Sequence, residues 1–139
     1  LHIKEFLTSL IDEIRHTYTL SNDISIESNI QDLSVPVKQS FPIGIIVNEL
    51  VTNAFKYAFT DSQAGKILIS VEQKNTQFIK ITVKDNGRGI PEEVTSKKSY
   101  GYGFTLIDGL TNQYDGSFDI ERNHGTEITA YLKIDFNRK

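Results

Sequence analysis

The sequence predicts a two-layer α/β sandwich of the α+β kind, in which a mixed, mostly antiparallel sheet carries helices on one face. Strand-like segments alternate apolar and polar residues, helical segments have one apolar stripe, and turn-forming residues separate them. Each strand and each helix therefore has one face to bury, and packing helices on one face of a sheet buries both. The 139 residues, 38% of them hydrophobic, suffice for one core. We expect a single domain over residues 1–139.

Three elements are expected in the first part of the chain. Apolar residues recur at helical spacing over residues 3–18, which predicts an amphipathic helix. Isoleucines alternate with polar residues over residues 24–30, as in a short, half-buried strand. A long helix should begin near Val37 and tolerate Pro42 close to its start.

The rest of the chain predicts two hairpins and one more helix. Residues 92–100 are polar and lack periodicity, so a loop is expected there, followed by a helix over residues 103–114. Period-two alternation marks the strands of the two hairpins, at residues 67–71, 79–83, 117–121 and 126–134.

Composition argues against several classes of function. The net charge of −3 has no basic block, which argues against nucleic acid as a partner. The absence of cysteine excludes disulfides and thiolate metal sites. No apolar run approaches the roughly 20 residues that span a bilayer, so we expect a soluble, cytoplasmic domain without direct membrane contact. The chain also has no methionine, so we expect that Leu1 is not a translational start.

Residues 48–59 carry a polar stripe in addition to an apolar one. At about 100° per residue, Glu49, Asn53, Lys56 and Tyr57 share a stripe turned away from the apolar positions. A carboxylate, an amide and an ammonium suit a magnesium–phosphate site, because Mg²⁺ takes one or two protein oxygens and phosphate takes a positive partner. The solvated face of an amphipathic helix would produce the same pattern.

Asp85 is in phase with the apolar residues of the strand at 79–83, so its carboxylate should point to the apolar side. An unpaired charge is costly there, and the group needs a hydrogen-bond donor. The exocyclic amino group of adenine would be such a donor, whereas guanine has a carbonyl at the same position. Gly87 and Gly89 would let the backbone approach the base. Alternatively, the Asp-Asn-Gly sequence is a turn in which Asp85 caps the next segment.

Gly101 and Gly103 stand where the loop at 92–100 meets the expected helix. Free backbone N–H groups and the helix dipole make such a junction an anion site, which suits a triphosphate. A lone pair of glycines at such a junction is ordinarily explained by a hinge in the loop or by a cap of the helix.

Four motifs, in this order, resemble the ATP-binding domain shared by gyrase, a heat-shock chaperone, histidine kinases and a mismatch-repair ATPase. They are NELVTNAFKYAF at residues 48–59, DNGRGIP at 85–91, the pair Gly101 and Gly103, and Gly125-Thr126. The first motif, preceded by LSVP and FPIG, is most similar to histidine kinases of the variant subfamily without the phenylalanine box. The resemblance covers nearly the whole chain and implies the Bergerat ATP-binding fold.

The resemblance implies roles for the polar stripe of residues 48–59. Asn53 would be a magnesium ligand, with Glu49 as a possible second one. Glu49 would also be the catalytic residue that orients or deprotonates the attacking group. Lys56 and Tyr57 would lie beside the phosphates.

The resemblance also implies how the base is held. Asp85 and Thr126 would hold the adenine, and residues 92–100 would form a lid over the nucleotide. His124 replaces the first glycine of a Gly-Gly-Thr sequence that is common in the family. Further nucleotide contacts are implied for Gly87, Gly89, Ile90, Gly101, Gly103 and Phe104.

The implied activity is that of an ATP-dependent protein histidine kinase. The domain would bind Mg–ATP and donate the γ-phosphoryl group to a histidine on a separate dimerisation domain, expected upstream of Leu1. The receiver domain of a response regulator would then take the phosphoryl group. Two alternatives stay open: an anti-sigma-type serine kinase, and a nucleotide-sensing module that has lost catalysis.

Overall fold

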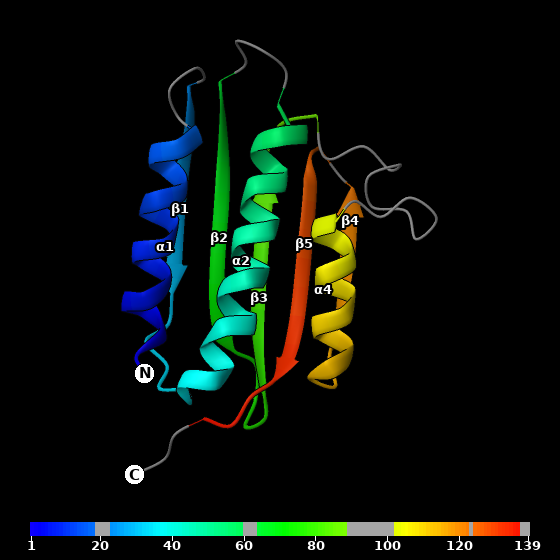
Figure 1. Ribbon diagram of the computed structural model, residues 1–139. Helices are drawn as coiled ribbons and strands as arrows, with labels where there is room; N and C mark the ends of the chain where they lie inside the picture. The colour runs from blue at the N-terminus through cyan, green and yellow to red at the C-terminus, as the bar shows by residue number, and fades with distance from the viewer. Residues whose placement is uncertain (19–22, 60–63, 89–101, 123, 137–139) are drawn as a thin grey trace.

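The computed structural model describes residues 1–18, 23–59, 64–88, 102–122 and 124–136 (Figure 1). Within these ranges, three helices cover one face of a five-stranded sheet whose strand order is β1-β2-β3-β5-β4 (Figure 1). The predicted two-layer α/β sandwich is therefore confirmed. The elements are α1 (Ile3–Tyr18), β1 (Ile24–Ile30), α2 (Val37–Tyr57), β2 (Gly65–Gln73), β3 (Phe78–Asp85), α4 (Tyr102–Gln113), β4 (Ser117–Arg122) and β5 (Thr126–Lys133).

The sheet is mixed, as expected. Strand β1 runs parallel to β2, because the chain returns to the same edge of the sheet through α2, and a parallel pair requires such a crossover. The other pairs are antiparallel, and both predicted hairpins, β2–β3 and β4–β5, are present.

Apolar side chains form rows across the three central strands on the face that the helices cover. Because side chains alternate along a strand, the intervening residues of β3, such as Lys80 and Thr82, lie on the opposite face and are partly exposed. The paired rows consist of Val71, Ile81 and Ala130, and of Ile69, Val83 and Ile128, all buried.

Helix α2 lies in the middle of the helical layer and contacts α1, α4 and the sheet. The chain approaches it through Pro36, and Pro42 is buried within its second turn, as the sequence allowed. At Gly44 the helix comes close to α1, because a Cβ atom there would lie 3.0 Å from Cε2 of Phe6. The buried surface of α2 is therefore wider than one stripe.

Several chain segments meet at one end of the molecule, drawn at the top of Figure 1. The C-terminal ends of α2 and β3 and the turn between β4 and β5 all lie there. In that turn His124 has φ 55° and Gly125 has φ 120°, a region that glycine enters more readily than other residues. This explains why glycine suits position 124. None of the described helices has the length and hydropathy to cross a bilayer.

Candidate functional site

Asp85 is the last residue of β3, and its side chain is 2% exposed. The predicted position on the apolar side of the sheet is confirmed. The N–H of Gly87 donates to Oδ1 over 3.1 Å, and the N–H of Thr126 also donates to the carboxylate. The bond from Gly87 closes an Asx turn, so the turn expected as the alternative is present as well.

Burial raises the pKa of the Asp85 carboxyl above that of an ordinary aspartate, because removing the charge from water is the largest effect. The hydrogen bonds from Gly87 and Thr126 act in the opposite direction and lower this pKa. A carboxylate has about four lone-pair positions, so these two bonds leave acceptor capacity. The Asp85 carboxylate can therefore accept a further hydrogen bond, which would stabilise its charged form.

The loop after β3 is fastened to the end of α2 and to the start of β2. The N–H of Arg88 donates to the carbonyl of Ala58 over 2.9 Å, and its Nε donates to the carbonyl of Tyr57 over 3.0 Å. Oδ1 of Asn86 accepts from the N–H of Lys66 over 2.7 Å. Sequence reasoning missed the role of Arg88, because Tyr57 lies 31 residues away in the chain.

Two glycines lie close to Asp85. A Cβ atom on Gly87 would be 2.7 Å from Cδ1 of Phe59 and would also clash with the carbonyl of Ala58. A Cβ atom on Gly125 would clash with the carbonyl of Asp85. Glycine at position 87 is therefore required by the neighbouring atoms of Ala58 and Phe59. The expected close approach of the Gly87 backbone to a base stays a prediction.

The polar stripe of α2 is divided between surface and interior. Lys56 is exposed and Glu49 half-buried, but Asn53 is only 6% exposed. The expectation that all of these residues turn away from the core was therefore wrong for Asn53, because the helices on either side of α2 widen its buried surface. Among the described residues, Nδ2 of Asn53 is the buried side-chain atom without a hydrogen-bond partner. Such an atom is costly unless a ligand completes it.

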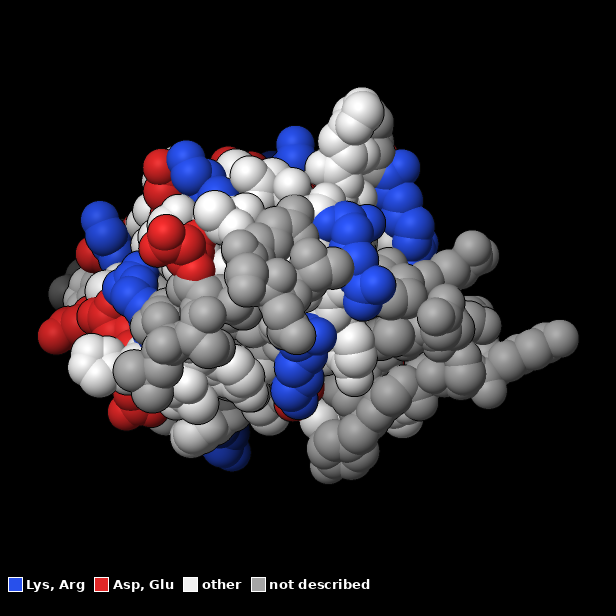
Figure 2. Space-filling view, turned by 90° about the horizontal axis from the view of Figure 1, so that it is seen from above, with Lys and Arg blue, Asp and Glu red and all other residues white. Residues whose placement is uncertain are grey.

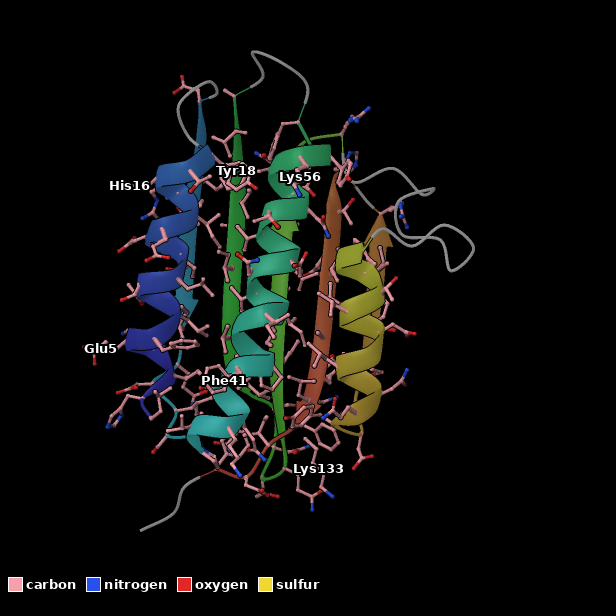
Figure 3. All side chains as sticks on the ribbon, viewed as in Figure 1. Glu5, His16, Tyr18, Phe41, Lys56 and Lys133 are labelled. Carbon is pink, nitrogen blue, oxygen red and sulfur yellow. The ribbon has the colours of Figure 1, made fainter. Side chains whose placement is uncertain are left out.

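Glu49 lines two grooves on the outer side of the helical layer. One, of about 290 Å³, lies between α1 and α2 and includes Lys56 and Tyr18, which lie near the same end of the two helices (Figure 3). The other, of about 440 Å³, is mainly apolar and reaches Leu106 of α4. Glu49 and Lys56 are thus accessible from outside. Neither Asp85 nor Asn53 is among the residues that line these two grooves.

The remaining candidates differ in what the structure describes. Tyr57 is half-buried and packs against the core, and Gly103 lies in the first turn of α4. Phe104 is 1% exposed, with its ring centroid 6.3 Å from that of Phe118, so its observed contacts are those of a core residue. The candidates Gly89, Ile90 and Gly101, like the expected loop at 92–100, lie outside the described residues.

The end of the molecule that carries Asp85 has an uneven distribution of charge. Viewed from this end, acidic side chains gather toward the left of the described surface, whereas lysine and arginine side chains are found across it (Figure 2).

The chain resembles known proteins over most of its length. Residues 39–136 match the family described as histidine kinase-, DNA gyrase B-, and HSP90-like ATPase. The chain is 29% identical over 117 residues to blue-light-activated histidine kinase 2 of Erythrobacter litoralis, covering 83% of this chain and 34% of that protein. It is 32% identical over 98 residues to the nitrate/nitrite sensor protein NarX of Escherichia coli, covering 69% of this chain and 15% of that protein.

A solved structure has the same fold. The blue-light-activated histidine kinase EL346 of Erythrobacter litoralis superposes with a TM-score of 0.87 at 24% identity, covering 97% of this chain and 42% of that one. The chain spans about a third or less of the length of the two curated relatives. Their names favour neither the serine kinase nor the module without catalysis. The chain belongs to the family of histidine kinase-, DNA gyrase B- and HSP90-like ATPases, as an ATP-binding catalytic domain of the sensor histidine kinase type.

Proposed function

We propose that this domain binds Mg–ATP and donates the γ-phosphoryl group to a histidine on a separate dimerisation domain of its parent kinase. The receiver domain of a response regulator would take the phosphoryl group next. Family membership supports ATP as the nucleotide. The observation that carries the proposal is Asp85, a buried carboxylate with acceptor capacity left after two backbone hydrogen bonds.

Asp85 recognises the base in this proposal. Its free acceptor position takes a hydrogen bond from the exocyclic amino group of adenine, while Gly87 and Thr126 hold the carboxylate in one orientation. A guanine at the same place would turn a carbonyl oxygen toward a carboxylate, which leaves two acceptors facing each other. The site therefore selects adenine.

Asn53 would hold the magnesium ion in this proposal, with Glu49 as a possible second ligand. A half-turn of the Asn53 amide exchanges its nitrogen and oxygen, so the buried position without a partner can present an oxygen to a cation. Glu49 lies one helical turn earlier. Within the described ranges, no three carboxylate, histidine or cysteine side chains form a metal site. This suits Mg²⁺, which takes few protein ligands and is completed by phosphate and water.

Phosphoryl transfer depends mainly on positioning and charge. Lys56 and Tyr57 lie beside the phosphates in this proposal; the ammonium of Lys56 offsets their negative charge, and the hydroxyl of Tyr57 donates a hydrogen bond to them. Glu49 accepts a hydrogen bond from the imidazole of the incoming histidine and can take its proton. The bond between the γ-phosphorus and the bridging oxygen breaks, a phosphorus–nitrogen bond forms, and ADP leaves. We place the domain in the cytoplasm, where ATP is available.

Calorimetric titration of the chain with a non-hydrolysable ATP analogue, with and without Mg²⁺, tests the proposal. We expect Asp85→Asn to weaken binding at least about tenfold, because the amide can present a donor to the amino group of adenine. We expect Asn53→Ala to reduce the gain in affinity that Mg²⁺ provides. Asp119→Asn and Asn112→Ala make the same chemical changes at exposed positions and should leave binding unchanged.

Two results would contradict the proposal. Absence of measurable binding would remove the nucleotide site altogether. Binding that is indifferent to Mg²⁺ and to Asn53→Ala would remove the metal site, even if adenine selectivity remained.

A further inference from the structure

The structure assigns a further residue to the adenine site: we infer that Phe59 is a positioning residue, whose ring holds Gly87 and, through it, the Asp85 carboxylate. The inference rests on the proposed function, in which Asp85 reads adenine. Phe59 follows the end of α2 by two residues and is 7% exposed.

Two glycines from different segments pack against the ring of Phe59. A Cβ atom on Gly87 would lie 2.7 Å from Cδ1 of the ring, and one on Gly65 would lie 2.6 Å from the same atom. Both distances are below the 3.0 Å that Cβ contacts keep. Backbone therefore approaches this ring from the loop after β3 and from the start of β2.

The position of Gly87 sets the orientation of the Asp85 carboxylate. The N–H of Gly87 donates to Oδ1 of Asp85 over 3.1 Å. The side of Gly87 where a Cβ atom would stand faces both the ring of Phe59 and the carbonyl of Ala58, which also accepts from the N–H of Arg88. A smaller side chain at position 59 would remove the contact of the ring with Gly87, so that Gly87 and its hydrogen bond to Asp85 could shift.

The start of β2 contacts the same ring and is itself held by hydrogen bonds. The N–H of Gly65 donates to the carbonyl of Asp23 over 3.0 Å, which fixes this strand against the start of β1. Asn86, next to Gly87, accepts from the N–H of Lys66. The ring of Phe59 thus packs against two neighbouring segments that are also hydrogen-bonded to each other, and a Cβ atom on either glycine would collide with it.

Phe59→Leu tests this role, with Phe55→Leu as the matched control. Phe55 is 8% exposed and near Phe59 in the chain, but its ring stacks on Tyr18 at 5.3 Å between centroids. For each variant the dissociation constants of Mg–ATP and Mg–inosine triphosphate are measured, together with the melting temperature. Hypoxanthine has a carbonyl where adenine has its amino group, so the ratio of the two constants reports the orientation of Asp85.

We expect Phe59→Leu to weaken ATP binding about tenfold and to change binding of inosine triphosphate little, because a displaced acceptor loses the adenine bond alone. The discrimination between the two nucleotides should therefore narrow by the same factor. Phe55→Leu should lower the melting temperature without narrowing the discrimination, since its ring stacks on Tyr18 and is not among the atoms nearest to a Cβ atom on Gly87.

Gly65→Ala provides a second variant, away from the groups proposed to contact the nucleotide. Its added methyl group requires the ring of Phe59 to move and should narrow the discrimination as Phe59→Leu does. Gly109→Ala is its control, because a Cβ atom there meets nothing within 4 Å. Gly65→Ala keeps the inference testable if Phe59→Leu does not fold.

Asp85→Asn separates this inference from the proposed function. If Asp85→Asn narrows the discrimination while Phe59→Leu and Gly65→Ala behave like their controls, the positioning role is overturned and the proposed function stands. If Asp85→Asn leaves the discrimination unchanged, adenine is not read by this carboxylate, and both are overturned.

Discussion

The carboxyl group of Asp85 is buried, and burial disfavours its charged form. Two backbone N–H groups hold its carboxylate, yet burial keeps the pKa of that carboxyl above its ordinary value. A buried group with a shifted pKa and spare acceptor capacity destabilises the free protein slightly and becomes useful when a donor arrives. This residue is therefore the most sensitive probe of the proposed site.

ATP affinity should fall on acidification at a higher pH than an ordinary aspartate would cause. Protonation of the Asp85 carboxylate weakens it as a hydrogen-bond acceptor for the amino group of adenine. Because the pKa of this carboxyl is raised, the loss of affinity should occur between neutral pH and about pH 4. Titration of the non-hydrolysable analogue across this range measures the effect. Asp85→Asn should show a flatter profile; an identical profile in both proteins would mean that another group titrates.

The same raised pKa predicts the sign of a stability change. The folded chain binds the Asp85 proton more readily than the unfolded chain, so the cost of the buried charge is present at neutral pH and released as the pH falls through the raised pKa. The unfolding free energy of the natural chain should therefore rise relative to that of Asp85→Asn on acidification. Parallel curves in chemical denaturation would contradict this.

At the scale of elements, helix α4 ends in a Schellman motif that returns the chain to the sheet. The N–H of Gly116 donates to the carbonyl of Thr111 over 2.7 Å, and the N–H of Asp115 donates to that of Asn112 over 3.3 Å. Asp115 takes the left-handed position with φ 54°, where glycine is more usual. A Cβ atom on Gly116 would lie 2.6 Å from the carbonyl carbon of Tyr131, so the turn contacts β5 directly.

Two glycines of this region should respond in opposite directions to alanine. Gly109 lies exposed inside α4 with open space around it, so Gly109→Ala should raise the unfolding free energy by about 0.5–1 kcal/mol. Gly116→Ala should lower it by more than about 1 kcal/mol, because its methyl group would collide with the backbone of β5. Urea denaturation of both variants measures this pair. Equal stability of the two would show that the turn can move away from β5.

At the scale of the whole molecule, the core and the site occupy different parts of the sheet. The apolar rows lie along the central strands, whereas Asp85 and its loop lie at the end where α2 and β3 terminate (Figure 1). The apolar rows of the central strands therefore contain none of the groups proposed to contact the nucleotide. Loss of stability and loss of binding should be separable by mutation.

Ile81→Ala should destabilise the chain and still leave its response to ligand intact. Ile81 is fully buried in the central strand β3, and the cavity left by its truncation should cost about 2–5 kcal/mol. A Mg–ATP analogue at 100 times its dissociation constant should add about 2.7 kcal/mol to the unfolding free energy of both proteins. Thermal melts with and without ligand measure both quantities. A response that disappears in Ile81→Ala would show that core and site are coupled.

The sequence by itself determined the elements of the fold and the direction in which Asp85 points. Both depend on periodicity along a short stretch of chain, and the strand that ends at Asp85 keeps its phase in the structure. The order of four motifs also sufficed to indicate the family, which comparison with known proteins confirmed. The roles of Glu49, Asn53 and Lys56 toward the nucleotide stay predictions.

Tertiary structure alone decided what surrounds these groups. Asn53 is buried because helices flank α2 on both sides, which its own helical angle did not reveal. The ring of Phe59 meets Gly65 and Gly87, and Arg88 meets the carbonyls at the end of α2. These contacts join residues that are distant in the chain and give no periodic signal, because a ring or a carbonyl acquires such neighbours only when the strands and helices pack together.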